Sequence, residues 1–240
     1  MNYKRILLKI SGEALSSLEP SSSNGFGINQ DMLFKIAKDI KVIHDQGVEI
    51  AVVVGGGNFF RGAHQTLPHL DRASADYMGM LATIMNGTAL HSVFVHEGIA
   101  CRHISSLPVH VVAETYSRER VIQHLNKKRV VVFSGGTGNP FFTTDTAAVL
   151  RAREMECDIL LKATKVDGVY SSDPLKNSDA KRYERVSFDE VIQNKLNVMD
   201  ATAITLAQEN KLPIAVFSIY EDNNFAKVLS HDGRFTLIKG

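Results

Sequence analysis

An apolar run of strand length meets three successive glycines in the stretch Val48-Glu49-Ile50-Ala51-Val52-Val53-Val54-Gly55-Gly56-Gly57-Asn58-Phe59-Phe60-Arg61-Gly62. Because glycine has no Cβ, the backbone N–H groups of such a turn can point toward one spot and approach an anion closely. The junction therefore predicts a phosphate-binding loop at the end of a strand.

A second junction of the same kind follows the apolar run Val130 to Phe133. There the chain continues as Ser134-Gly135-Gly136-Thr137-Gly138-Asn139-Pro140-Phe141-Phe142-Thr143-Thr144-Asp145. Two glycine-rich loops after two strands predict a protein that holds two phosphate groups.

Apolar runs of strand length alternate with segments of helical period. The predicted strands are Arg5 to Ile10, Val48 to Val54, Ile99 to Ser105, Arg129 to Phe133 and Ile159 to Lys162, and the predicted helices are Asp31 to Gln46, Arg72 to Glu97, Ser117 to Asn126 and Asp145 to Glu156. Several of the strands are continuously hydrophobic, which indicates burial on both faces, as in a parallel sheet covered by helices. We therefore expect an α/β fold.

Spacings of three and four residues support the helices. In the helix from Asp31, the apolar residues Leu33, Ile36, Ile40 and Ile43 recur at these spacings, and Gly47 supplies the stop. Beyond the alternating part, Ser187 to Glu190 has the sequence of a capping box that opens a further helix, and a further strand is predicted from Pro213.

The long helix from Arg72 has an apolar face of its own. Met78, Leu81, Met85 and Ala89 lie on one side of it. We expect this face to belong to the core, because methionine fills irregular gaps in hydrophobic interiors.

Length and composition indicate one domain of residues 1–240. With 240 residues and 44% hydrophobic content, the chain is long enough to bury a large core. A possible boundary between two lobes lies near Thr164, where the alternation of strands and helices is followed by the polar, turn-rich segment Lys165 to Arg185. Two lobes on one sheet are compatible with this pattern.

Charge and cysteine content exclude several classes of partner. A formal net charge of +1 provides no broad positive surface for nucleic acid or an anionic membrane. The apolar stretch Ile6 to Leu8 is too short for a signal peptide or a membrane span, and we expect no later segment to reach membrane length. Cys101 and Cys157 have no metal-type spacing, which suits a reducing compartment and predicts a cytoplasmic location.

Two lysines end predicted strands, at the edge where parallel sheets bind their ligands. Lys9 could extend its stem along this edge into solvent, but the adjacent Ser11-Gly12 permits close approach of an anion and favours a ligand. Lys162 follows three apolar residues. An ammonium about 4 Å from a phosphate oxygen is worth about 4 kcal/mol at an effective dielectric constant of about 20, against about 0 to 1 kcal/mol for an exposed ion pair. A phosphate partner is the better explanation of Lys162.

Three further side chains are open to two interpretations each. Asp145 either caps the helix that begins there or has a functional role, as an orienter of the lysines or a link to magnesium. Arg61 either binds phosphate through two parallel hydrogen bonds or anchors the triple-glycine loop at the surface. Asp76 either accepts hydrogen bonds from ribose hydroxyls or only favours the helix N-terminus.

The sequence lacks the motifs of several other catalytic and binding sites. The nine histidines have no zinc-type spacing, and neither a Ser-His-Asp nor a Cys-His arrangement can be argued. The motif G-x-x-x-x-G-K-[ST] is absent, and Gly136-Thr137-Gly138 lacks the third glycine of the dinucleotide fingerprint. A kinase with this sequence must have a fold other than the P-loop fold.

Five motifs in order resemble the bacterial uridylate (UMP) kinase family of the amino acid kinase superfamily, from Lys4 to about Leu237. They are Lys9 to Leu15, Gly55 to Gly62, Ala75 to Thr83, Gly135 to Asp145, and Lys162 to Tyr170 with Asp173-Pro174. The resemblance implies the amino acid kinase fold, a three-layer α/β/α sandwich with a mostly parallel central sheet in a single domain. It also implies an acceptor-binding N-terminal half, about 1–163, and an ATP-binding C-terminal half, about 164–240.

The resemblance implies roles for individual residues. The catalytic residues would be Lys9, Lys162, Asp145 and Arg61. ATP would be contacted by Lys9, Ile10, Ser11, Gly12, Gly57, Arg61, Thr164, Tyr170 and Asp173. UMP would be contacted by Gly56, Asp76, Thr137, Gly138, Asn139, Pro140, Phe141, Phe142, Thr143 and Thr144.

The implied reaction is transfer of the γ-phosphoryl group of MgATP to UMP, giving UDP and ADP in pyrimidine nucleotide and CTP biosynthesis. It needs no general base, because a phosphate monoester with a second pKa of about 6 is mostly dianionic at neutral pH. Magnesium would be held by the nucleotide phosphates and water rather than by protein ligands.

The resemblance further implies a homohexamer that GTP activates and UTP inhibits. One stretch departs from the family. Ser16 to Asn24 is several residues longer than the usual loop, in the neighbourhood where family members respond to GTP.

Three other functions compete with this one. Within the superfamily, the acceptor could be a carboxylate or a carbamate. A non-catalytic nucleotide-binding regulatory or storage module is a different class, but the joint presence of Lys9, Lys162 and Asp145 argues against it. A dinucleotide-dependent oxidoreductase is the weakest alternative.

Overall fold

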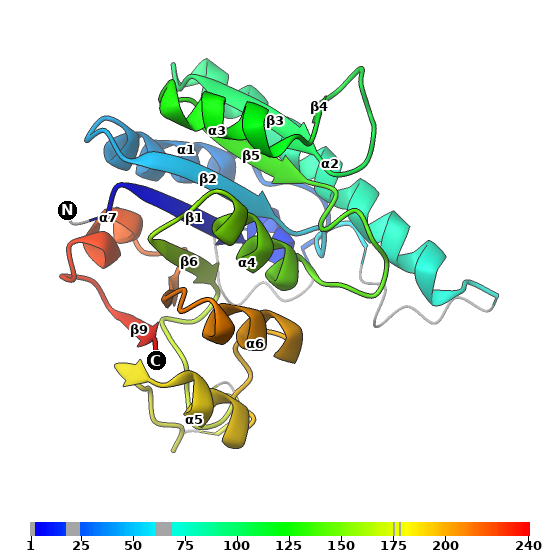
Figure 1. Ribbon diagram of the computed structural model, residues 1–240. Helices are drawn as coiled ribbons and strands as arrows, with labels where there is room; N and C mark the ends of the chain where they lie inside the picture. The colour runs from blue at the N-terminus through cyan, green and yellow to red at the C-terminus, as the bar shows by residue number, and fades with distance from the viewer. Residues whose placement is uncertain (1–2, 18–24, 61–68, 175, 178) are drawn as a thin grey trace.

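The computed structural model describes residues 3–17, 25–60, 69–174, 176–177 and 179–240, which form nine strands and seven α-helices (Figure 1). The strands are β1 (Arg5–Ile10), β2 (Glu49–Val54), β3 (Cys101–Ser105), β4 (Glu114–Thr115), β5 (Val130–Ser134), β6 (Ile159–Thr164), β7 (Arg185–Val186), β8 (Ile214–Ser218) and β9 (Phe235–Ile238). The helices are α1 (Gln30–His44), α2 (Arg72–His96), α3 (Arg118–Asn126), α4 (Thr144–Glu154), α5 (Phe188–Gln193), α6 (Ala201–Glu209) and α7 (Asn224–Leu229). A short 3-10 helix, η1 (Gly12–Ser16), follows β1.

The described strands form one sheet in the order β4-β3-β5-β2-β1-β6-β8-β9-β7. Neighbouring strands are parallel except for β8 and β9, which are antiparallel. The carboxyl ends of β5, β2, β1 and β6 therefore meet at one edge of the sheet, where both glycine-rich loops begin. The predicted mostly parallel sheet is confirmed.

Helices cover both faces of this sheet (Figure 1). On one face, Ile6 and Leu8 of β1 share a core with residues of α1, α2 and α7. On the other, Leu7 shares a core with residues of α3, α4, α5 and α6. Alternate side chains of one strand thus enter different cores, which explains why the strands read as continuous apolar runs. The three-layer arrangement is confirmed.

The predicted helices and strands are present, with small shifts at their ends. Gly47 adopts a φ of 84° after α1, as the predicted stop requires, and the capping box of Ser187 and Glu190 opens α5. The sequence pattern does not predict α6, α7, β4, β7 or β9, because short elements show too little of a period to be recognised.

The predicted orientation of α2 is wrong. Met78, Leu81 and Met85 are 40%, 51% and 53% exposed, so they face away from the sheet. Ala89, the fourth residue of the predicted face, is partly buried and packs against the core. The inner face consists instead of Ala75, Met80, Ala82, Thr83, Ile84, Asn86, Gly87, Leu90 and Phe94. Between Asp76 and His96 the helix has no Asp, Glu, Lys or Arg, so apolar residues recur on all its sides and the period does not tell which side is buried.

The expectation that no segment reaches membrane length is also wrong for α2. The helix has 25 residues, and its most apolar window has a mean hydropathy of 1.3. Within the protein, however, 44% of that window is buried. A core helix of a soluble α/β protein meets the same length and composition criteria, and α2 packs against α1, β3 and β5 as such a helix does.

Candidate active site

Lys9 and Lys162 lie side by side, because they are register partners on the parallel strands β1 and β6. Paired positions project from the same face of a sheet, so both side chains point toward α4. Lys9 Nζ lies 2.6 Å from Asp145 Oδ1, and Lys162 Nζ lies 2.6 Å from Asp145 Oδ2. Both lysines are buried. One carboxylate thus bridges the two strand-end lysines.

Asp145 does not cap α4. The N-cap is Thr143, whose Oγ1 accepts hydrogen bonds from the N–H groups of Asp145 at 3.0 Å and Thr146 at 3.3 Å. The Thr143 hydroxyl in turn donates to Asp200. Of the two interpretations of Asp145, the structure therefore favours a residue that orients the lysines.

Burial and charge set the protonation of this cluster. Burial raises the pKa of Asp145, but the charges of Lys9 and Lys162 outweigh this effect and bring the pKa to about 2. Burial lowers the pKa of Lys162 to about 8, and Asp145 only partly opposes this shift. Near neutral pH the cluster therefore has two ammonium groups for one carboxylate, and its net positive charge attracts an anion.

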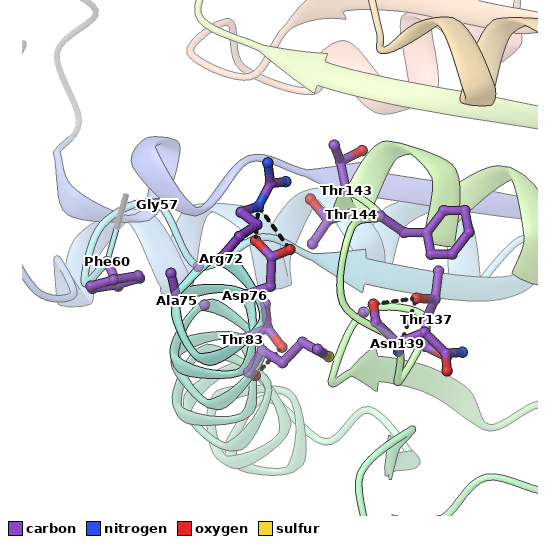
Figure 2. A pocket seen from close by; sticks show the side chains of 15 residues that line it. Gly57, Phe60, Arg72, Ala75, Asp76, Thr83, Thr137, Asn139, Thr143 and Thr144 are labelled. Carbon is purple, nitrogen blue, oxygen red and sulfur yellow. Dashed lines mark hydrogen bonds and ion pairs between the residues drawn. The ribbon is translucent and has the colours of Figure 1, made fainter. Parts of the chain in front are cut away.

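A first cavity of about 250 Å³ lies between α2, the triple-glycine loop and the loop after β5 (Figure 2). Of the residues predicted to contact UMP, those that line it are Gly56, Asp76, Thr137, Asn139, Phe142, Thr143 and Thr144. Gly138, Pro140 and Phe141 belong to the same loop but are not part of this lining. On the side of α2, the cavity is also lined by Arg72, Ala75, Gly79, Met80 and Thr83.

Asp76 connects the two walls of the first cavity. Its carboxylate is paired with Arg72, one turn earlier on α2, at 2.8 Å (Figure 2). The same carboxylate accepts a hydrogen bond from the Phe141 N–H at 2.7 Å. The N-cap of α2 is Asp71, so Asp76 is not needed to cap this helix. Asp76 therefore holds the tip of the loop after β5 against α2.

The glycines allow close packing of backbone on backbone. A Cβ on Gly12 would lie 2.5 Å from Gly57 N, and one on Gly56 would lie 2.7 Å from Gly79 O. No real Cβ tolerates these distances, so the turn after β1, the triple-glycine loop and α2 can meet only through glycine. This packing brings the loops next to the lysines, in addition to leaving room for an anion.

A second cavity of about 450 Å³ lies on the β6 side of the cluster. Of the residues predicted to contact ATP, those that line it are Lys9, Ser11, Thr164, Tyr170 and Asp173, together with Lys162. The segment Asn194 to Val198, between α5 and α6, supplies another wall. No sequence motif marks this segment, so its role could not be predicted.

The other residues predicted to contact ATP lie elsewhere. The side chain of Ile10 is buried in the core, Gly12 packs on the triple-glycine loop, and Gly57 lines the first cavity. Arg61 lies outside the described residues. Arg72, in contrast, had a signal in the sequence, because it precedes Asp76 by four positions, the spacing of an ion pair on a helix.

The two cavities meet at the lysine cluster. Thr144 lines the first cavity, and the next residue is Asp145, whose partners Lys9 and Lys162 line the second. Two anionic ligands, one in each cavity, would therefore have their charged ends near the same ammonium groups.

A magnesium ion at this site would take most of its ligands from outside the protein. In the part of the chain that the structure describes, no group of three or more His, Cys, Asp or Glu side chains could hold a metal. Each oxygen of Asp145 already faces an ammonium group, so this carboxylate fits magnesium only through a bridging water. The residues thus fit an ion that arrives on the phosphates of a nucleotide.

Comparisons with known proteins identify the family that has this architecture. The model of the amino acid kinase family matches residues 4–218. The chain is 55% identical over 238 residues to the uridylate kinase of Rickettsia prowazekii (strain Madrid E), covering 99% of this chain and 96% of the relative. It is 55% identical over 239 residues to the uridylate kinase of Rickettsia conorii, covering 100% and 97%.

Solved structures give the same result. The UMP kinase from Bacillus anthracis has a TM-score of 0.93 and 38% identity, with 100% of this chain and 97% of that chain covered. The UMP kinase from Ureaplasma parvum has a TM-score of 0.90 and 36% identity, with both chains fully covered at 100%.

The depressed pKa of Lys162 is open to direct measurement. In the free protein, the side-chain NMR signal of Lys162 is expected to titrate with a midpoint near pH 8, because burial disfavours its charged form. In Asp145→Asn the midpoint should fall further, because the opposing carboxylate charge is gone. A short unstructured lysine peptide, whose ammonium has the usual pKa of about 10.4, serves as the control. A midpoint for Lys162 equal to that of the control would contradict the description of the cluster.

Proposed function

The chain belongs to the amino acid kinase family and, within it, to the uridylate kinases, and we propose on that premise that it transfers the γ-phosphoryl group of ATP to UMP, giving UDP and ADP. The observation that carries the proposal is the position of Lys9 and Lys162 where two cavities meet. Similarity to uridylate kinases over the whole chain does not favour a carboxylate or carbamate acceptor, a non-catalytic module or a dinucleotide-dependent enzyme.

We assign UMP to the first cavity and ATP to the second. The second cavity, at about 450 Å³ against about 250 Å³, suits the larger nucleotide. This assignment gives an acceptor-binding half of about residues 1–163 and an ATP-binding half of about residues 164–240. Lys9 and Ser11 reach from the first half into the second cavity. Asp76, on the wall of the first cavity, is placed for the ribose hydroxyls of UMP.

Lys9 and Lys162 supply the charge that the reaction needs. Phosphoryl transfer passes through a loose transition state, in which positioning and neutralisation of negative charge matter more than covalent help. Asp145 holds the two ammonium groups together and limits their mutual repulsion. An incoming polyphosphate stabilises the charged form of Lys162, so this ammonium stays protonated when ATP is bound.

The acceptor phosphate of UMP needs no general base, because it is already mostly dianionic at neutral pH. Magnesium bound to the phosphates of ATP would neutralise part of their charge. Arg61, which resemblance to the family adds to the phosphate-binding residues, lies outside the described part of the chain.

We further propose that the enzyme acts in the cytoplasm and contributes to pyrimidine nucleotide and CTP biosynthesis, with GTP as activator and UTP as inhibitor. Resemblance to the family supports UTP as inhibitor. It supports GTP less directly, because Ser16 to Asn24 departs from the family where its members respond to GTP, and residues 18–24 of this stretch lie outside the described part of the chain. The thiols support the location, because Cys101 and Cys157 are both free and buried, and burial raises the pKa of each to about 12. Thiols of this kind suit a reducing compartment.

We propose that the chain forms a homohexamer, as the family does, and that the outer face of α2 is one of its contacts. This face exposes Tyr77, Met78, Leu81, Met85 and Val95. None of these five residues is charged, so the exposed faces of two copies would not repel each other. Figure 1 shows α2 extending beyond the body of the protein, where a second copy has access to it. Such a symmetric contact makes pairs, and a hexamer needs a further contact elsewhere.

The reaction is tested by an acceptor panel. With MgATP, release of ADP should be fastest with UMP and slower with CMP, aspartate, acetylglutamate and carbamate. Each acceptor is assayed with and without GTP, which also tests activation. Faster turnover with aspartate, acetylglutamate or carbamate than with UMP would overturn the proposed acceptor.

Lys162→Ala tests the role of the cluster. We expect kcat to fall by about a hundredfold to a thousandfold, as happens when one donor to the charge of a transition state is removed. The melting temperature should change little, because Asp145 keeps Lys9 as its partner. Lys211→Ala, at an exposed position, is the control. Turnover of Lys162→Ala close to that of the wild type would exclude the assigned role.

Leu81→Glu tests the contact through α2. A charge in the middle of the exposed apolar face should repel its copy, so light scattering after size exclusion should show a smaller assembly than the wild type. Val42→Glu is the matched control, because Val42 is 40% exposed on α1. An unchanged mass of Leu81→Glu would show that α2 is not a subunit contact.

A further inference from the structure

One buried arginine takes no part in the mechanism described above. Arg151 lies on α4, is only 4% exposed and lines neither cavity. Its guanidinium is paired with Glu154 and lies over the ring of Tyr116, with 3.7 Å between Cζ and the ring centroid. A buried guanidinium with an ion pair and an aromatic partner is held in one orientation.

Another contact of Arg151 leads to the loop after β5. Arg151 Nη2 donates to Ser106 Oγ at 3.1 Å, and the Ser106 hydroxyl donates to the carbonyl of Gly136 at 2.8 Å. Because the hydroxyl accepts from a cation, its own donation to Gly136 is strengthened. The three groups form a relay from α4 to the wall of the first cavity.

Close packing adds to the relay. A Cβ on Gly138 would lie 3.3 Å from Ser106 Cβ, and one on Gly135 would lie 3.1 Å from Ser106 N. Gly135, Gly136 and Gly138 all have positive φ angles, of 75°, 54° and 81°. Glycine reaches this backbone easily, and the Gly138 N–H closes the turn by donating to the Gly135 carbonyl at 2.9 Å. Ser106 adds a contact from outside the loop.

The relay determines the direction of one backbone donor. In a planar trans peptide, the carbonyl of Gly136 and the N–H of Thr137 point in opposite directions. Since Ser106 holds this carbonyl, the Thr137 N–H points away from Ser106. This N–H donates to no group in the described part of the chain, and Thr137 lines the first cavity.

We propose that Arg151 and Ser106 are positioning residues for the phosphate acceptor, which set the Gly136–Thr137 peptide so that its N–H is available to a ligand in the first cavity. The inference rests on the proposed function, because it assigns the acceptor to that cavity. Neither residue touches the acceptor, and both act through the loop.

The test compares steady-state constants for both substrates. Ser106→Ala removes the link and is expected to raise the KM for UMP about tenfold, with kcat and the KM for ATP within about twofold of the wild type, an effect of the size of one lost hydrogen bond. Arg151→Met should give a similar increase. Ser106→Thr keeps the hydroxyl and should restore the KM for UMP.

A double-mutant cycle separates the relay from two independent effects. In Ser106→Ala combined with Arg151→Met, the KM for UMP should be no higher than in the more affected single variant, because the two residues act in series. Arg153→Met is the matched control on the same helix, since Arg153 is exposed, and it should change neither KM. Multiplied single effects in the double variant would overturn the relay.

Other outcomes are equally informative. An equal rise in both KM values, or no rise in Ser106→Ala, would also overturn the relay, and Ser106→Ala decides the matter alone if Arg151→Met does not fold. A wild-type enzyme that does not phosphorylate UMP would instead overturn the proposed function. The two failures are therefore distinguishable.

Discussion

Repulsion between two ammonium groups, relieved by one buried carboxylate, is the constraint on which the site depends. The register of β1 and β6 places Lys9 beside Lys162, and like charges this close in a buried position need an anion between them. Asp145 is that anion, so α4 has to begin at the carboxyl edge of β1. The capping of α4 is consequently left to Thr143, which keeps the carboxylate available to the lysines.

The beginning of α4 fixes where the loop after β5 must end, and separate contacts hold the loop in between. Thr83 Oγ1 accepts from the Gly135 N–H at 2.7 Å, Ser106 holds the Gly136 carbonyl, and Asp76 accepts from the Phe141 N–H. Because these anchors come from α2 and from the end of β3, a helix layer and the sheet both contribute to one wall of the first cavity. A loop rich in left-handed glycines gains a defined shape in this way.

The inner and outer faces of helix α2 have different surroundings. Its inner face carries Thr83 and Asn86, and Asn86 Nδ2 donates to the carbonyl of Gly55 at 2.7 Å, so the helix is tied to both glycine-rich loops. Its outer face is apolar and exposed. The high hydropathy of the helix therefore comes from two apolar faces, one packed on the sheet and one exposed at the surface of the described chain.

The sequence by itself determined the alternation of strands and helices, the parallel sheet, the two glycine-rich loops and the strand-end lysines. These features are local, because hydrophobic period and glycine content depend only on neighbouring residues. Tertiary structure decided which face of α2 is buried, which residue caps α4, and that Asn194 to Val198 line the second cavity. It also decided that Arg151 reaches Ser106, a contact between residues 45 positions apart. Such features depend on which surfaces meet when the layers pack, and no local pattern in the chain contains that information.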